Sequence, residues 1–244
     1  MMNKLKFTLL LFFMQFICSA QQLHFSGKIL FERKENIHKQ FTGNSFWEEQ
    51  YRNRMPKYKV DEFSLVFNKN KTLYHSTKLD DNPMLTWFRV ASNNIVLNNL
   101  QSLKQTNIKE IFDETFLIED SIPALVWRYH GDYRKIAGYN CRKASTIIND
   151  SLYIIAFYAD EIPVKAGPES LNGLPGMILG YAIPRLHITC FATKVITYIP
   201  EEKEFEYKKP KAKSINKNDF LKYIYSSTKN WGEYAGKVVF KVLI

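Results

Sequence analysis

The chain has 244 residues, of which 45% are hydrophobic and 24% are charged. This composition excludes collagen-like, low-complexity and wholly disordered proteins, and the length allows one large domain or two small ones. Lysine and arginine number 34 against 24 acidic residues, so the formal net charge is +10. Aromatic residues make up 15% of the chain, which favours half-buried strand surface over helix.

The first twenty residues have the pattern of an export signal. Lys4 and Lys6 give a positive start, the segment Phe7–Ile17 is almost wholly apolar, and small residues at 18–20 suit cleavage before residue 21. A helix of about eleven residues reaches roughly 16 Å, too short for a hydrocarbon core of about 30 Å. We therefore predict a signal peptide at 1–20 and a mature chain that is exported, either periplasmic or associated with the outer membrane. A lipid anchor on Cys18 is the less favoured alternative, because Ile17 stands where a lipoprotein signal requires a small residue.

The basic residues do not form a nucleic-acid-binding pattern. The densest group lies at 208–213, directly after several glutamates at 201–206. Such mixed charge is typical of a solvated hairpin tip or linker. We expect no nucleic-acid partner.

Two cysteines follow the predicted signal, Cys141 and Cys190. An even pair in an exported protein is a disulfide candidate, and two buried free thiols are the alternative. The sequence leaves both interpretations open. It contains no close cysteine pair and no His-x3-His, so we predict no metal site.

Short strand patterns follow one another along most of the chain, separated by turn residues. A hairpin is predicted around the turn at 68–71, a second around Gly131–Asp132 and a third around Asn149–Asp150. Two helices are predicted, one at 44–55 and one near Phe220–Tyr225, because apolar residues recur there at helical spacing. The predicted strands are 23–32, 63–67, 72–76, 90–97, 102–111, 114–118, 125–129, 133–136, 141–148, 152–158, 177–183, 187–199, 204–209 and 238–244.

This order predicts the fold class. Sequential strands without regular strand–helix alternation favour an antiparallel meander over a parallel α/β sheet. A long antiparallel sheet must curl, close or be covered. We predict a mainly β protein in which residues 21–244 form a single domain, an open half-barrel with one or two helices across its concave face. Outer-membrane lipoprotein carriers have this general architecture, which is an analogy of fold alone.

One stretch is specific. Residues 173–179 read Gly-Leu-Pro-Gly-Met-Ile-Leu, after Tyr-Ala-Asp-Glu-Ile-Pro at 158–163, Gly-Pro at 167–168 and Ile-Ala-Gly-Tyr-Asn-Cys-Arg-Lys-Ala at 136–144. Together with 116–120 and Trp127, this ordered set resembles the GLPGLI family of exported proteins, best known from Bacteroidota. The resemblance covers most of the mature chain and is strongest over 110–183. The chain departs from the family pattern at Glu169–Ser170, where Trp-Lys is expected. The resemblance implies a secreted β-rich protein, and some family members are encoded near genes for outer-membrane receptors.

The Gly-Leu-Pro-Gly segment reads as a tight turn that leads into a strand. Pro175 fixes its own φ, and Gly176 stands at the third position of a type II turn, where φ is positive. With Gly173, these residues set the turn in the structural interpretation. In the functional interpretation the surrounding apolar residues form the rim of a binding site. The ligand-binding candidates are Tyr158, Ile162, Pro163, Pro168 and Leu174.

The sequence proposes no catalytic residue and no cofactor. It lacks Gly-x-Ser-x-Gly and a Gly-Lys-Ser/Thr phosphate loop, and its five histidines are dispersed. The leading hypothesis is an exported, non-enzymatic binding or carrier module for a lipid or other hydrophobic ligand. The alternative is a protein-interaction accessory of an outer-membrane receptor or transporter, which needs an exposed apolar patch or an unpaired strand edge. The apolar segment 238–244 is a candidate edge, or else it completes the sheet.

Overall fold

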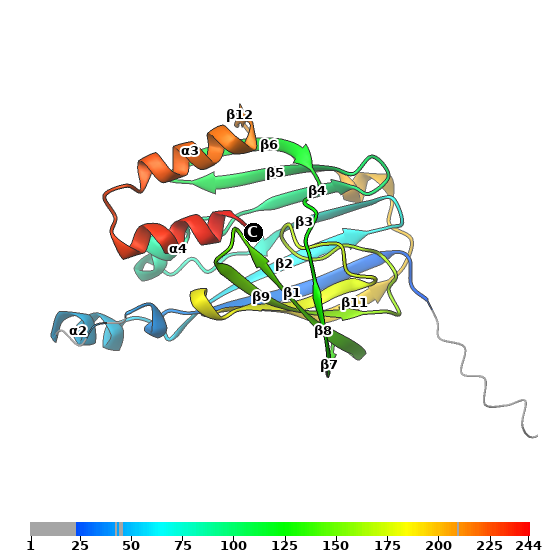
Figure 1. The fold of residues 1–244 in the computed structure, drawn as a ribbon, viewed down its shortest axis with the longest axis horizontal. Helices are drawn as coiled ribbons and strands as arrows, with labels where there is room; N and C mark the ends of the chain where they lie inside the picture. Colours follow the sequence, from blue (N-terminus) through cyan, green and yellow to red (C-terminus); the bar gives the residue numbers. More distant parts are fainter. Residues whose placement is uncertain (1–22, 42, 44–45, 209) are drawn as a thin grey trace, which may run out of the picture.

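The computed structural model describes residues 23–41, 43, 46–208 and 210–244. The predicted export signal at 1–20 lies outside the described residues. The described strands form one twelve-stranded sheet, in the order β12-β6-β5-β4-β3-β2-β1-β11-β10-β9-β8-β7 (Figure 1). The strands are β1 (Gly27–Asn36), β2 (Tyr58–Phe67), β3 (Lys71–Lys78), β4 (Ile95–Asn99), β5 (Lys104–Ile111), β6 (Glu114–Ser121), β7 (Arg128–Ile136), β8 (Tyr139–Ile148), β9 (Leu152–Ala159), β10 (Met177–Ile183), β11 (Ile188–Thr197) and β12 (Lys213–Ile215).

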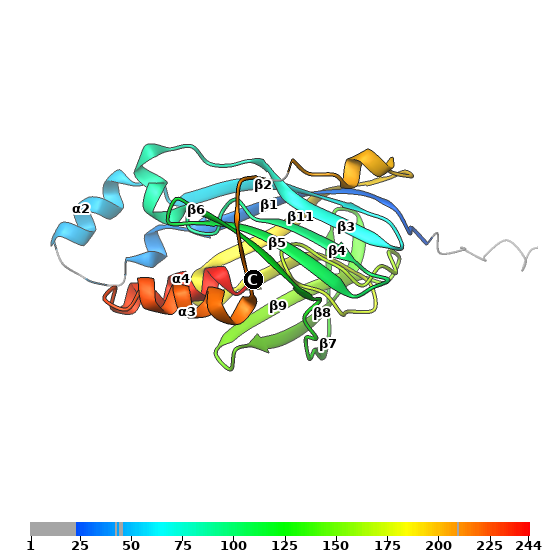
Figure 2. The same cartoon turned by 90° about the horizontal axis from the view of Figure 1, so that it is seen from above.

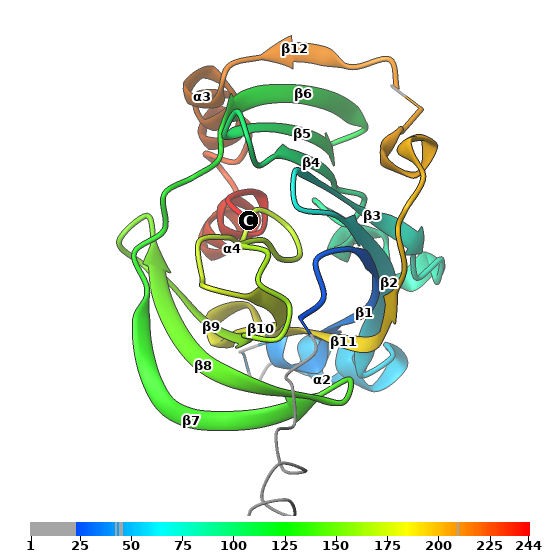
Figure 3. The ribbon, with the colours of Figure 1, turned by 90° about the vertical axis from the view of Figure 1, so that its right-hand side faces the viewer.

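The prediction of a mainly β, antiparallel meander is confirmed, and the sheet consists of two meanders. The first meander consists of β1 to β6, which follow one another along one half of the sheet. The second consists of β7 to β11, which follow one another along the other half. The two meanders are joined where β1 pairs with β11. The connection at 122–127 therefore passes from one end of the arc to the other (Figure 3). Among the described strands, only the short β12 pairs in parallel, with β6.

The sheet is strongly curved and unclosed, as predicted for a half-barrel. Figure 3 shows its open side between β6 and β7, with α3 (Lys217–Ser227), α4 (Glu233–Val242) and the loop 160–176 on the concave side and α2 (Phe46–Arg54) outside the curve. Burial alternates along β1: Ile29 and Phe31 are buried on the concave face, and Leu30 between them is only partly buried. Phe63 and Tyr74 stack beside them, with ring centroids 5.0 Å apart. Burial of this face against the loop and helices supplies the main hydrophobic core.

Local chemistry explains several turns. The side chain of Asn68 accepts hydrogen bonds from the backbone N–H groups of Asn70 and Lys71, which closes the predicted β2–β3 hairpin. The β5–β6 turn consists of Phe112 and Asp113, both at positive φ (53° and 62°). This is the turn type whose twist matches a hairpin, although glycine and asparagine are its usual residues.

In the described part of the chain, three α-helices accompany the sheet: α2 (Phe46–Arg54), α3 (Lys217–Ser227) and α4 (Glu233–Val242). The first two correspond to the predicted helices. Asn216 caps α3 by accepting from the N–H of Asp219 at 2.9 Å, and Phe220 packs on Phe116 in β6. Figure 2 shows α3 and α4 side by side at one end of the sheet, with α2 projecting beyond it. None of the helices in the described ranges is long and apolar enough to cross a membrane.

The prediction of a closing strand at 238–244 is wrong, because most of this segment lies in α4. Its run of β-branched residues has strand propensity. In the structure, Val238, Val239 and Val242 join a cluster with Phe220 and Ile224 of α3. Packing of this apolar stripe outweighs local propensity.

Two further predictions are wrong for local reasons. The segment 125–136 does not form a hairpin at Gly131–Asp132, because β7 runs through it as one strand whose pairing with β8 is irregular between Tyr129 and Tyr133. The predicted strand at 204–209 is wrong for residues 204–208, and residue 209 lies outside the described residues. A 3-10 helix, η5 (Glu202–Phe205), forms there instead, and Glu201 and Glu204 close its first turn as a capping box.

Cys141 and Cys190 are both buried and free, so the structure contains the second of the two arrangements left open by the sequence. Cys141 lies in β8 and Cys190 in β11, with β9 and β10 between them. Three strand spacings correspond to roughly 14 Å, whereas a disulfide requires Cα atoms within about 7 Å. Burial also raises the pKa of the Cys141 thiol, to about 12.

Candidate functional site

The loop 160–176, which carries the Gly-Leu-Pro-Gly segment, folds into the concave interior of the sheet. Of the five candidates for a binding rim, Tyr158, Ile162 and Leu174 belong to the main hydrophobic core and are at most 1% exposed. Pro168 is buried and Pro163 is half-buried. These residues fill the concave interior of the curved sheet, which we call the bowl. Tyr158, Ile162 and Leu174 have no exposed surface that a ligand could contact.

The glycines of this segment have roles that differ from the predicted type II turn. Gly173 has a positive φ of 88°, whereas Gly176 does not have positive φ. A Cβ on Gly176 would lie 2.0 Å from the carbonyl oxygen of Ala159 in β9. Gly176 is therefore required by close approach of two backbones, not by turn geometry. Pro175 is exposed between them.

Beneath this loop lies a cluster of buried charges that the sequence did not reveal. Arg33 of β1 donates to Asp61 of β2 and to Glu169 of the loop, each at 2.9 Å. Lys59, two residues before Asp61 in β2, also donates to Asp61. The four side chains, all at most 9% exposed, balance as two cations and two anions. Two pairs drawn out of water in this way are stable only when both partners are present.

Arg33 and Asp61 favour each other's charged form. Burial acts to lower the pKa of Arg33, but Glu169 and Asp61 outweigh it and keep that pKa well above its usual value. Burial likewise acts to raise the pKa of Asp61, and the neighbouring Arg33 and Lys59 outweigh it, so the pKa of Asp61 is lowered. The carboxylate of Glu169 also accepts from Asn94 at 3.0 Å, and its backbone has a positive φ of 55°. Glu169, where the chain departs from the GLPGLI pattern, thus connects the loop 160–176 to β1 by an ion pair.

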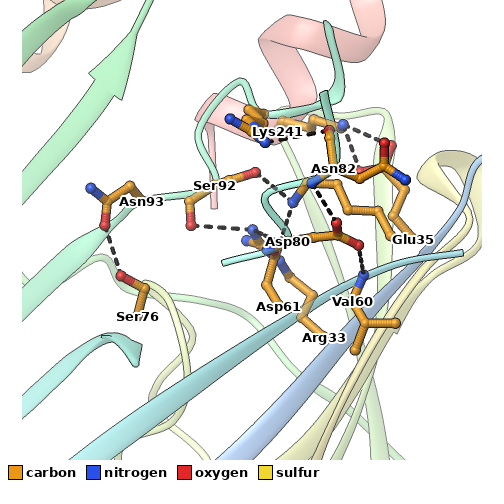
Figure 4. Close-up of polar contacts among 12 residues, drawn as sticks. Arg33, Glu35, Val60, Asp61, Ser76, Asp80, Asn82, Ser92, Asn93 and Lys241 are labelled. Atoms are coloured by element: carbon orange, nitrogen blue, oxygen red, sulfur yellow. Dashed lines mark hydrogen bonds and ion pairs between the residues drawn. The ribbon is translucent and has the colours of Figure 1, made fainter. Parts of the chain in front are cut away.

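The charge cluster also anchors the segment 89–94, which leads into β4. Ser92 accepts from Lys59 through its hydroxyl at 3.0 Å and from Arg33 through its carbonyl at 3.3 Å (Figure 4). A separate buried pair, Glu35 with Lys241 at 2.7 Å, holds α4 against β1. The contacts of Ser92 and the Glu35–Lys241 pair position two walls of a cleft, the segment 89–94 and α4.

The cleft has a volume of about 440 Å³. Three regions that are far apart in sequence form it: the 3-10 helix η3 (Pro83–Phe88) with the segment 89–94 that follows it, the β5–β6 turn, and the α3–α4 connection with the start of α4. Its lining residues are Leu79, Thr86, Trp87, Arg89, Val90, Ser92, Asn93, Glu110, Phe112, Asp113, Trp231 and Tyr234.

Aromatic rings form the walls of the cleft. Trp87 is 73% exposed and Trp231 is 36% exposed. Trp231 is held in place by Tyr234, which stacks on it with an interplanar angle of 27°, and by Phe112, whose ring centroid lies 5.1 Å away. Burial raises the pKa of Tyr234 to about 12, so its hydroxyl stays protonated and donates to the carbonyl oxygen of Trp87 at 2.8 Å. One hydrogen bond therefore couples the two tryptophan-bearing segments.

Polar groups line the remainder. Asn93 donates to the carboxylate of Glu110 at 3.1 Å and accepts from Ser76 at 2.7 Å. Asp113 is exposed on the β5–β6 turn. Large aromatic residues at positive φ are rare, and Phe112 has this conformation where it meets Trp231. Backbone strain of this kind is found preferentially at ligand sites.

Sequence reasoning missed this cleft. Trp87 and Trp231 are 144 positions apart, and neither belongs to a motif. The one local signal is the Phe-Asp pair at 112–113 between two short strand patterns. No group of metal-ligating side chains occurs in the part of the chain that the structure describes.

A second buried lysine gives a pH-dependent prediction. Lys109 in β5 is 4% exposed. Burial lowers its pKa to about 8, against the opposing effect of Glu169. In the unfolded chain the Lys109 ammonium keeps its proton up to about pH 10, whereas in the folded protein it loses the proton near pH 8. The unfolded state therefore binds more protons between these values, and the free energy of unfolding should rise with pH there. Between pH 7 and pH 9, the free energy of unfolding of the wild type should therefore rise because of Lys109. In Lys109→Met this rise should be smaller by about 1 kcal/mol.

The measurement is urea unfolding at the two pH values, with Lys104→Met as the control. Lys104 lies in the same strand and is exposed, so its replacement should leave the pH dependence unchanged. An unchanged slope in Lys109→Met would show that Lys109 has an ordinary pKa in the folded protein.

The comparisons with known proteins agree on the fold. A family model described as the N-terminal domain of N-glycanase peptide matches residues 57–225. Two structures of PNGF-II, in space groups C2 and P21, are 17% and 15% identical to this chain, with TM-scores of 0.52 and 0.51. Each covers 83% of this chain, which spans only 33% and 34% of theirs. No curated protein matches the sequence. Identity this low shows a shared fold alone, but the family model spans more than half of the chain, so the protein belongs to the family of N-glycanase N-terminal domains.

Proposed function

We propose that this protein is a non-catalytic accessory module that holds a sugar ring of a glycan in the cleft between Trp87 and Trp231. The observation that carries the proposal is the pairing of two exposed indole rings with hydrogen-bonding side chains in one cavity. Its volume of about 440 Å³ falls within the usual range for small-ligand sites, about 300–1,000 Å³.

The chemistry of a pyranose fits these walls. Its C–H groups form an apolar face that can lie on a flat indole ring, and its hydroxyl groups project around the rim. The carboxylates of Glu110 and Asp113 can accept from paired hydroxyls, and the Asn93 amide can donate or accept. Because Tyr234 and Phe112 already hold Trp231 in place, little side-chain entropy is lost when a sugar binds to it.

The family supports the same ligand class. Its description names an N-glycanase, and that name points to protein-linked glycans. This chain spans about a third of the PNGF-II chains, so we propose for it only recognition of a glycan, not its cleavage. Export through the signal at 1–20, membership of the GLPGLI group and a site of action in the cell envelope are part of the proposal.

The carrier hypothesis from the sequence receives less support. It requires an unfilled apolar concavity, but α3, α4 and the loop 160–176 lie inside the bowl (Figure 3). The largely apolar cavity between β5, β6 and α3 measures about 110 Å³, below the usual size of ligand sites. The alternative hypothesis, an accessory role in protein interaction, is supported by the outer edge of β7. Among the described residues this strand is paired only with β8, so its other edge can pair with a partner.

The test is titration of the full chain with N,N′-diacetylchitobiose, followed by tryptophan fluorescence and by calorimetry. We expect saturable binding by the wild type and at least tenfold weaker binding by Trp87→Ala. Trp87 is largely exposed, so its removal should leave the unfolding free energy within about 0.5 kcal/mol. The matched control is Tyr153→Ala, which removes an aromatic ring that is 41% exposed on the outer face of β9.

Equal binding by the wild type and by Trp87→Ala would contradict the proposal, as would a loss of the same size in Tyr153→Ala. Absence of binding to this sugar, to a mannose oligomer and to a glycopeptide would contradict it as well. Glu110→Gln adds an independent check, because it keeps the shape of the cleft and removes one charged acceptor.

A further inference from the structure

One end of the sheet is unprotected. At the other end, β12 lies along the outer edge of β6. Within the described ranges, β7 pairs with β8 alone (Figure 3). Near its C-terminal end β7 also touches β11, where the guanidinium carbon of Arg134 lies 4.2 Å from the ring centroid of Phe191. β7 has nine residues, or about 30 Å of strand, and all but Ile136 are wholly or partly exposed. A long open edge presents unpaired backbone N–H and C=O groups that can pair with another chain.

The side chains along this edge discriminate among partners. Strands β7 and β8 carry five basic residues and one acid, a net charge of +4 out of +10 for the whole chain. The one acid, Asp132, is neutralised by Lys143 at 2.7 Å. Pairing of this edge with a second copy of itself would place basic residues opposite basic residues, which is unfavourable. An acidic strand would instead meet opposite charges.

Apolar contacts are available on the same edge. Tyr129 and Tyr133 are 55% and 57% exposed, on either side of the irregular pairing with β8. Val126, just before the strand, is 87% exposed. Arg142 of β8 lies over the ring of Tyr133, with 6.0 Å between the guanidinium carbon and the ring centroid. Added strands gain affinity from main-chain hydrogen bonds and specificity from side chains of this kind.

We propose that the outer edge of β7 captures an extended, acidic segment of a partner protein as an additional strand of the sheet. The cationic residues Arg128 and Lys135 near its two ends attract the segment, and Tyr129 and Tyr133 pack against its apolar side chains. This site is distinct from the Trp87–Trp231 cleft, and neither proposal depends on the other.

The test uses the full chain and a fluorescein-labelled nine-residue peptide that alternates glutamate with valine, measured by fluorescence polarisation. Two matched peptides accompany it, one with lysine in place of glutamate and one with two central valines replaced by proline. Proline removes a backbone donor and cannot continue a ladder. We expect the acidic peptide to bind at least tenfold more tightly than either, and hydrogen exchange to slow at backbone amides of β7.

The charge contribution is tested with Arg128→Glu/Lys135→Glu, which should weaken binding at least tenfold. The control is Lys194→Glu/Lys104→Glu, which changes the net charge equally at exposed positions on other strands and should weaken binding less than threefold. Equal binding of the proline peptide, an equal loss in the control variant, or no binding of the acidic peptide at about 1 mM would each overturn the proposal.

Discussion

Gly176→Val is expected to destabilise the protein by about 3 kcal/mol, at the upper end of overpacking effects. A Cβ at this position would meet the carbonyl oxygen of Ala159 at 2.0 Å and its carbonyl carbon at 2.7 Å. These are backbone atoms at the end of β9, which is paired on both sides, with β8 and with β10. Neither strand can move away without loss of ladder hydrogen bonds. The measurement is the free energy of unfolding in urea.

The matched control is Gly236→Ala. Gly236 lies within α4, its φ is not positive, and a Cβ there would meet nothing within 4 Å. Replacement by alanine should stabilise the protein by about 0.5–1 kcal/mol, because glycine weakens a helix interior. If Gly176→Val unfolded at the same urea concentration as the wild type, the close approach of the two backbones would be refuted.

Arg33→Met is expected to cost about 3–5 kcal/mol, the usual cost of removing one partner from a buried ion pair. The change leaves the carboxylate of Glu169, which is fully buried, without its cation, and it removes one of the two cations beside Asp61. The second variant, Arg33→Met/Glu169→Gln, removes both charges of one pair and should recover part of the loss. Urea unfolding of the two single variants and the double variant gives the coupling energy.

Lys34→Met is the control for this prediction. Lys34 is the next residue along β1 and pairs with Glu32 at 2.7 Å, but both side chains are more than a third exposed. Exposed pairs of this kind contribute about 0–1 kcal/mol. If Lys34→Met and Arg33→Met were equally stable, the charges around Arg33 would not be buried as the structure has them.

The Arg33 cluster also bears on the cleft. Ser92 lines the cleft and bonds both Arg33 and Lys59, and Glu169 ties the loop 160–176 to the same group. The buried charges therefore hold one wall of the candidate sugar site against the sheet.

Local patterns sufficed wherever a residue and its structural partner are close in sequence. Alternation along 63–67 and 72–76, with Asn68 between them, defined the β2–β3 hairpin, and Asn216 with the apolar stripe at 220–225 defined α3. Composition and strand order were enough for an antiparallel half-barrel. A bonded turn or an apolar face is encoded within a few residues, which is why these predictions hold.

The tertiary structure decided the rest, because the decisive contacts join distant segments. Residues 238–242 are helical because they pack against α3. Glycine is required at 176 because the backbone of Ala159 lies so close. Glu169 is buried as an ion because Arg33, 136 residues away, pairs with it. The pairing of β1 with β11 turns two meanders into one bowl, and the cleft exists only because residues 87, 110 and 231 meet at its end. Such contacts depend on the arrangement of the whole sheet, which no single stretch of the sequence specifies.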